Sequence, residues 1–220
     1  MYATVNNIQL YYEVVGEGKP VILLHGNGED CKIFSVLANK LSPNFKVYSI
    51  DTRGHGHSTP TNCLSYNLMC EDIAEFIVKN NIDKPLLYGF SDGGIIGLMI
   101  AGKYPDMLSK LIVCGANSSP QGLKFKWRFL IRASHFFTRS AKLKMMLKEP
   151  NIKESDLAKI KIPVLVTAGE KDMIKKSNTE FIAHKIKSSQ LIILPKETHS
   201  SYVINSSKLY DITKKFIYSS

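Results

Sequence analysis

The stretch LLYGFSDGG at residues 86–94 decides how this chain is expected to fold. Its apolar first residues are typical of a short buried strand, and a run with helical character follows from Ile95 to Tyr104. A serine flanked by glycines between a strand and a helix suits a nucleophile elbow, because glycine has no Cβ atom to clash where the chain doubles back. The sequence therefore predicts that the Ser91 hydroxyl stands at the carboxyl end of a strand, beside N–H groups that can stabilise negative charge.

Strand and helix patterns alternate on both sides of this stretch. A hairpin is predicted around Asn6-Asn7, since β-branched and aromatic residues flank a turn dipeptide. The predicted strands are 2–5, 8–15, 21–24, 46–50, 85–88, 111–114, 162–166 and 191–194, and the predicted helices are 33–41, 70–78, 95–104, 179–186 and 208–218. Such alternation is typical of an α/β fold with a mostly parallel sheet, whose sites lie at the carboxyl ends of its strands.

The alternation stops in residues 118–150, called the 118–150 segment below. Lys124, Arg128 and Arg132 are spaced four apart, as on one face of a helix. Alternate residues from Leu123 to Phe129 are apolar, however, so a strand remains open there as well. We expect one domain over the whole chain of 220 residues, in which this segment is an insertion over the sheet and too short to form a second core.

The 118–150 segment also concentrates the positive charge of the chain. The formal net charge is +10, and residues 121–150 hold eight Lys and Arg residues against Glu149 alone, which leaves seven of the ten charges there. A nucleic-acid binder would carry its basic face on the main body, in a recognisable module that this sequence lacks. No nucleic-acid partner is therefore expected. The basic residues either keep the protein soluble or face an anionic group or a membrane surface.

Apolar runs and cysteines predict a cytoplasmic protein without integral membrane association. No apolar run reaches the ~20 residues that span a bilayer. The stretch from Met1 to Leu10 lacks the basic and then apolar pattern of a signal peptide. The four cysteines form no C-x-x-C pair and are expected as buried thiols in a reducing compartment: Cys31, Cys63, Cys70 and Cys114.

A serine nucleophile needs a base and an acid on the same edge of the sheet. Among the six histidines, His199 follows the last predicted strand after a short loop, which places it at the carboxyl edge with Ser91. Asp172 follows the preceding strand on that edge and is expected to orient the imidazole. Glu170 competes for this role, but it lies nearer the strand end and has less freedom to reach across. The predicted catalytic residues are therefore Ser91, Asp172 and His199.

The turn HGNG at residues 25–28 follows another predicted strand at the same edge. Its glycines let backbone N–H groups face inward, toward the oxygen of a reacting carbonyl. We predict that the N–H groups of Asn27 and Asp92 form an oxyanion hole, with a contribution of roughly 3 kcal/mol per donor. His25 is expected to hold the turn by hydrogen bonding rather than to act in the chemistry.

Five motifs together resemble those of the α/β-hydrolase superfamily, in the order that this family has them along the whole chain. They are HGNG at 25–28, DTRGHGHS at 51–58, GFSDGG at 89–94, GEKD at 169–172 and THS at 198–200. The order of the serine, the aspartate and the histidine is also that of the family. The resemblance implies an eight-stranded, mostly parallel sheet with helices on both faces, a short cap inserted after the sixth strand, and no cofactor. The serine at the elbow argues against the dehalogenases and epoxide hydrolases of this fold, which have an aspartate there.

Asp92, beside the expected nucleophile, leaves two interpretations open. Its carboxylate could cap the helix that begins near Gly93, where negative charge is favoured by ~0.3–1 kcal/mol. It could instead select a cationic substrate, since the GFSDGG form resembles that of hydrolases acting on amino-acid esters. His55 and His57 resemble loop residues of the family rather than metal ligands, and no metal site is predicted.

The aromatic residues of the 118–150 segment are expected to bury the underside of a lid or to line an apolar acyl pocket. In the second interpretation, a basic residue such as Lys124 would meet an anionic head group. The aromatic residues concerned are Phe125, Trp127, Phe129, Phe136 and Phe137. The predicted substrate contacts are Asn27, Asp92, Trp127 and Phe125.

The sequence thus predicts an enzyme, a serine hydrolase of the carboxylesterase kind. Its expected substrate is a small carboxylic ester or thioester, cleaved through an acyl-enzyme on the predicted Ser-His-Asp triad. One alternative uses the same triad to hydrolyse a carbon–carbon bond or to transfer an acyl group. An alternative of another class is a small-molecule receptor that retains only residual hydrolase activity.

Overall fold

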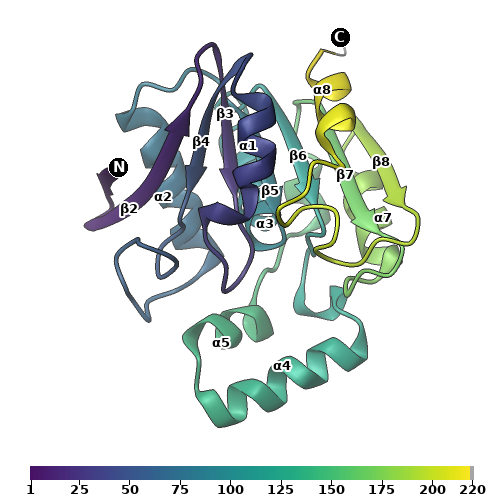
Figure 1. Cartoon of the computed structure of the whole chain (residues 1–220). Coiled ribbons are helices and arrows are strands. Elements are labelled where there is room, and N and C mark those ends of the chain that lie inside the picture. Colours follow the sequence, from purple (N-terminus) through teal and green to yellow (C-terminus); the bar gives the residue numbers. More distant parts are fainter. Residues whose placement is uncertain (219–220) are drawn as a thin grey trace.

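The computed structural model describes residues 1–218, and its centre is an eight-stranded sheet with the order β1-β2-β4-β3-β5-β6-β7-β8 (Figure 1). The strands are β1 (Tyr2–Val5), β2 (Ile8–Val15), β3 (Lys19–Leu24), β4 (Phe45–Ile50), β5 (Leu86–Phe90), β6 (Lys110–Cys114), β7 (Val164–Gly169) and β8 (Ser189–Leu194). β1 pairs antiparallel with β2 and β2 antiparallel with β4, whereas every pair from β4 to β8 is parallel. The predicted α/β fold with a mostly parallel sheet is confirmed.

Helices cover both faces of the sheet (Figure 1). The helices of the main body are η1 (Cys31–Phe34), α1 (Ser35–Leu41), α2 (Tyr66–Lys79), α3 (Asp92–Lys103), α6 (Glu154–Leu157), α7 (Lys176–Lys185) and α8 (Tyr210–Tyr218). Side chains of β3 alternate between the two layers, so that Val21 and Leu23 pack with α1 and α8. Ile22 and Leu24 point the other way and pack with α2, α3 and α7. This period of two buries the central strands on both faces, as expected for a parallel sheet.

The observed elements agree with the predicted ones and are mostly longer. The hairpin around Asn6-Asn7 has both residues at positive φ, which asparagine tolerates better than most residues. Helix α2 begins four residues before the predicted start, because the Ser65 side chain caps it by accepting the Leu68 N–H. Helix α3 begins at Asp92 rather than Ile95, since the elbow leads from strand to helix without a linker.

The 118–150 segment is helical, so the strand left open by its alternating apolar residues is not formed. It comprises η2 (Pro120–Gly122), α4 (Phe125–Thr138) and α5 (Ala141–Lys148), which follow the sixth strand and lie beyond the carboxyl ends of the parallel strands (Figure 1). Its anchor is a small apolar cluster of Leu123, Ile131 and Ile174. Among the described residues of α4, Ile131 alone is buried. None of the helices within residues 1–218 has the length and apolar character needed to cross a bilayer.

Candidate active site

Ser91 lies between β5 and α3 in a strained backbone conformation, with φ 51° and ψ −111°. Non-glycine residues seldom adopt such angles, which persist only where surrounding contacts hold them. The Ser91 N–H donates to the Cys114 carbonyl at 2.8 Å. A Cβ atom on Gly93 would lie 2.1 Å from the Leu24 carbonyl oxygen, so α3 approaches β3 this closely only because the residue is glycine. These contacts keep the serine at the turn.

The carboxyl edge of the sheet joins three predicted residues in one chain of hydrogen bonds. The Ser91 hydroxyl oxygen lies 3.1 Å from His199 Nε2, and His199 Nδ1 lies 2.7 Å from Asp172 Oδ1. A carboxylate only accepts hydrogen bonds, so Nδ1 carries the proton and Nε2 is left to accept one from the serine. The Ile174 N–H also donates to Asp172 Oδ1, at 2.9 Å, and fixes the carboxylate in place.

Glu170, the competing acid, does not reach the imidazole. Its side chain is exposed, and its Oε2 accepts the Lys196 N–H at 2.8 Å. Asp172 is buried, and the His199 ring lies against Gly115, where φ is +63° and a Cβ atom would come within 2.9 Å of the ring. The geometry therefore brings Asp172, and not Glu170, to His199.

The two predicted oxyanion donors lie at the ends of neighbouring strands β3 and β5. Within residues 1–218, neither the Asn27 N–H nor the Asp92 N–H donates to a protein acceptor. The turn that carries Asn27 is held by His25, whose Nδ1–H donates to the Gly26 carbonyl at 2.7 Å and whose Nε2 accepts the Thr52 N–H at 3.0 Å. Burial lowers the pKa of His25, so its ring is neutral and holds this hydrogen-bonding pattern at ordinary pH.

The Asp92 carboxylate lies at the start of α3, where the interpretation as a favourable negative charge placed it, but it makes no capping hydrogen bond. The carboxylate lies in the first turn of the helix, but no N–H group of the helix donates to it. Instead, Oδ1 accepts the Tyr66 hydroxyl at 2.7 Å and Oδ2 accepts the Asn27 side-chain amide at 3.0 Å. Burial raises the pKa of Asp92, and these two hydrogen bonds oppose the rise. The selection of a cationic substrate by Asp92 stays a prediction.

Three residues near the site were missed by sequence reasoning. Tyr66, at the start of α2, gives no local signal because its partner Asp92 lies 26 residues further along the chain. Glu29 accepts the Gly26 N–H at 2.9 Å, and its place just after the HGNG turn could have revealed it. Lys142, in α5, is half-buried; burial lowers its pKa, and the charge of the nearby Asp92 opposes this shift.

The aromatic residues of the 118–150 segment do not pack beneath a lid. The side chains of Phe125 and Trp127 are exposed, as are those of Phe129, Phe136 and Phe137, so the expectation that they bury the underside is wrong. Contact of Phe125 or Trp127 with a substrate stays a prediction. A cavity of about 730 Å³ lies instead between α5 and the loop that follows β4, and Arg139, Lys142 and Lys144 are among the residues that line it.

The two histidines of the DTRGHGHS segment lie in the loop after β4. His55 Nδ1 is 3.0 Å from the Arg53 carbonyl oxygen, and burial lowers the pKa of His55 to about 3. The His57 N–H donates to the Asp51 carboxylate at 2.7 Å, a contact within the same loop. In the part of the chain that the structure describes, no group of three or more His, Cys, Asp or Glu side chains could hold a metal ion.

Known sequences resemble this chain over half of its length or more. A family model described as alpha/beta hydrolase fold matches residues 19–144. Serine hydrolase BPHL of Homo sapiens is 25% identical over 246 residues, which cover 97% of this chain and 84% of that protein. The pimeloyl-[acyl-carrier protein] methyl ester esterase of Vibrio cholerae is 30% identical over 119 residues, or 54% of this chain and 45% of that enzyme.

Solved structures resemble the chain over its full length. The enol-lactonase from Burkholderia xenovorans LB400 superposes with a TM-score of 0.83 and 19% identity, and the match covers 100% of both chains. A thermophilic esterase from Thermogutta terrifontis gives a TM-score of 0.78 at 22% identity, over 98% of this chain and 96% of the other. At these identities the likeness shows the fold.

Proposed function

From the premise that this chain belongs to the α/β-hydrolase family and is an enzyme of the serine hydrolase and esterase kind, we propose that it cleaves a small carboxylic ester or thioester with Ser91 as the nucleophile. The hydrogen-bonded chain from Ser91 through His199 to Asp172 carries this proposal. A hydroxyl is a weak nucleophile at neutral pH, and an imidazole within hydrogen-bond reach removes that limitation.

The proposed reaction has two halves. In the first, His199 Nε2 takes the hydroxyl proton while Ser91 Oγ attacks the carbonyl carbon, and the same proton then passes to the departing alcohol or thiol. In the second, His199 takes a proton from water, which attacks the acyl-enzyme, and Ser91 Oγ leaves with that proton as a hydroxyl. The Asp172 carboxylate stabilises the imidazolium that forms in each half.

The oxyanion of both tetrahedral intermediates would be bound by the N–H groups of Asn27 and Asp92. Both N–H groups are without a protein acceptor within residues 1–218, which supports the assignment. The Asn27 side chain is tied to the Asp92 carboxylate, so the two donors are held in a fixed relation to each other. We further propose that these two side chains border the bound substrate, and that the chemistry requires no metal or cofactor.

The test is replacement of the nucleophile. Ser91→Ala should lower the turnover of a p-nitrophenyl ester by about 10⁴-fold or more and abolish labelling by a fluorophosphonate probe. Ser35→Ala, at an exposed position of α1, serves as the matched control and should leave rate and labelling unchanged. A Ser91→Ala protein that folds and keeps its esterase rate would refute the proposal.

A substrate panel separates the proposal from its alternatives. Turnover of vinylogous diketones, or of esters only in the presence of acceptor alcohols, would indicate carbon–carbon hydrolysis or acyl transfer. A small-molecule receptor would show a large increase in melting temperature with ligand but negligible multiple turnover. An esterase should turn over simple esters in water, with acyl chain length determining the rate.

A further inference from the structure

Helix α4 exposes more large apolar side chains than any other described element of the molecule. Twelve large hydrophobic residues within residues 1–218 are exposed, and half of them lie in this one helix: Phe125, Trp127, Phe129, Leu130, Phe136 and Phe137. Phe129 and Phe136 are 61% and 63% exposed, and Phe137 is 81% exposed. Monomeric soluble proteins seldom expose large apolar residues as a contiguous patch, and such patches mark interaction surfaces.

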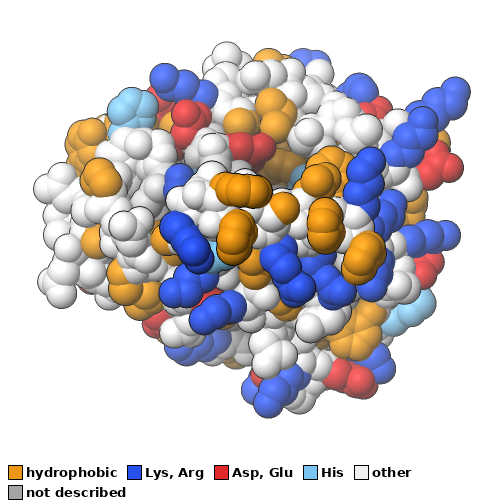
Figure 2. Space-filling view, turned by 90° about the horizontal axis from the view of Figure 1, so that it is seen from below, with side chains coloured by type: hydrophobic (Ala, Val, Ile, Leu, Met, Phe, Trp, Pro, Cys, Tyr) orange, Lys and Arg blue, Asp and Glu red, His pale blue; other side chains and the backbone are white. Residues whose placement is uncertain are grey.

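Three of the exposed phenylalanines form a stripe because of their spacing. Phe129 and Phe136 lie four and eleven residues after Phe125, or about one and three helical turns, so the three side chains share a face of the helix. Ile131 points away from this face and fixes α4 to the rest of the molecule. Figure 2, which views the molecule from the side of α4, shows this row of hydrophobic side chains with Lys and Arg side chains directly beside it.

The charge beside the stripe has a single sign. No acidic residue occurs between Asp106 and Glu149, whereas Lys126, Arg132 and Arg139 lie in or directly after α4. Lys126 and Arg132 form no ion pair among the described residues, and Arg139 stacks over the Phe136 ring at 5.3 Å. A second copy of α4 on this face would bring like charges together, so charge complementarity argues against self-association.

We propose that α4 docks on an anionic lipid bilayer, with its phenylalanine stripe in the headgroup region and its Lys and Arg side chains on the lipid phosphates. An amphipathic helix with aromatic residues on one face and basic residues beside them binds in this way, parallel to the surface. Because α4 and α5 lie beyond the carboxyl ends of the strands, docking turns the edge that carries Ser91 toward the bilayer (Figure 1). The proposal stands on exposure and charge, and it holds whatever ester the site cleaves.

The experiment measures binding of the full chain to lipid vesicles by flotation. Vesicles of equal parts phosphatidylglycerol and phosphatidylcholine should carry the protein upward in flotation. Vesicles of phosphatidylcholine alone should bind at least about tenfold more weakly, and added salt should weaken binding to the anionic vesicles.

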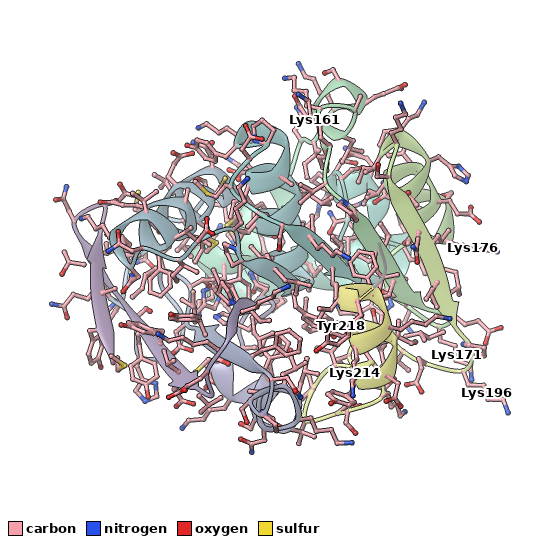
Figure 3. All side chains as sticks on the ribbon, turned by 90° about the horizontal axis from the view of Figure 1, so that it is seen from above. Lys161, Lys171, Lys176, Lys196, Lys214 and Tyr218 are labelled. Atoms are coloured by element: carbon pink, nitrogen blue, oxygen red, sulfur yellow. The ribbon has the colours of Figure 1, made fainter. Side chains whose placement is uncertain are left out.

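Paired variants test the two components of the surface. Phe129→Ser with Phe136→Ser, and separately Lys126→Gln with Arg132→Gln, should each weaken binding to the anionic vesicles by at least about tenfold. Figure 3, from the side opposite to Figure 2, labels the control positions Lys161, Lys196 and Tyr218, all of which are exposed. Lys161→Gln with Lys196→Gln removes the same charge, and Tyr218→Ser removes an equally exposed aromatic ring, so both controls should bind as the parent does.

Three outcomes would overturn the proposal. The first is no binding to the anionic vesicles, and the second is binding that the Phe129 and Phe136 variant retains. The third is a dimer in solution that the same variant abolishes, which would assign the stripe to a second copy. Turnover of a soluble ester reports separately on the proposed esterase function, because Phe129 and Phe136 have no place in that site.

Discussion

The carboxyl edge of the sheet and helix α4 hold their side chains in opposite ways. At the edge, Ser91, Asp172 and His199 are fixed by hydrogen bonds and by glycines that leave no room for a Cβ atom. In α4, six large apolar side chains face solvent and Ile131 alone is buried. The side chains at the edge are therefore held in one geometry, whereas most side chains of α4 can be replaced with little change in the free energy of unfolding. The residues proposed for the chemistry and the residues that form the exposed surface of α4 are separated in space.

Among the substitutions that test this difference between the carboxyl edge and α4, the largest loss of activity is expected at Asp172. Asp172→Asn should lower kcat/KM for an ester by about 10³–10⁴-fold, because an amide in that place favours the wrong imidazole tautomer. Glu170→Gln is the matched control. It removes a carboxylate two residues away that accepts a hydrogen bond from the Lys196 N–H, and it should change the rate by less than about twofold. Equal losses in the two variants would contradict the assignment of Asp172.

A smaller effect, on folding, is expected at Gly93. Gly93→Ala would place a Cβ atom 2.1 Å from the backbone of β3, and should lower the free energy of unfolding by about 3 kcal/mol or more. Gly28→Ala is the control, since φ is +76° there but no atom lies within 4 Å of the added Cβ, so only about 1–2 kcal/mol is expected. Urea unfolding measures both, and a mild Gly93→Ala would show that the edge is less tightly determined than its geometry indicates.

The smallest effect is expected in α4. Phe137→Ser should change the free energy of unfolding by less than about 0.5 kcal/mol, because the ring is 81% exposed. Phe76→Ala, in the core between α2 and the sheet, should cost about 3–5 kcal/mol in the same measurement. If Phe137→Ser destabilised the protein as much as Phe76→Ala does, then α4 would pack differently from the arrangement in Figure 1.

Most of the fold could be predicted from the sequence because its signals are local. Buried parallel strands read as short apolar runs, and their alternation with helical spacing indicates an α/β sheet wherever it occurs. The elbow is visible because only glycine fits at positions such as Gly93. The order of residues along the carboxyl edge then follows from topology, since parallel strands end at the same side, and this brought Asp172 and His199 to attention with Ser91.

The sequence by itself determined the sheet, the elbow and the edge on which the candidate residues meet, because each of these features depends on residues that are close together along the chain. Only the tertiary structure decided the partners of Asp92, because Tyr66 and Asn27 lie 26 and 65 residues away and give no periodic signal. It also decided that the aromatic residues of α4 face solvent rather than the sheet. A pattern of apolar residues predicts a helix with an apolar face, and the surrounding elements determine what, if anything, covers that face.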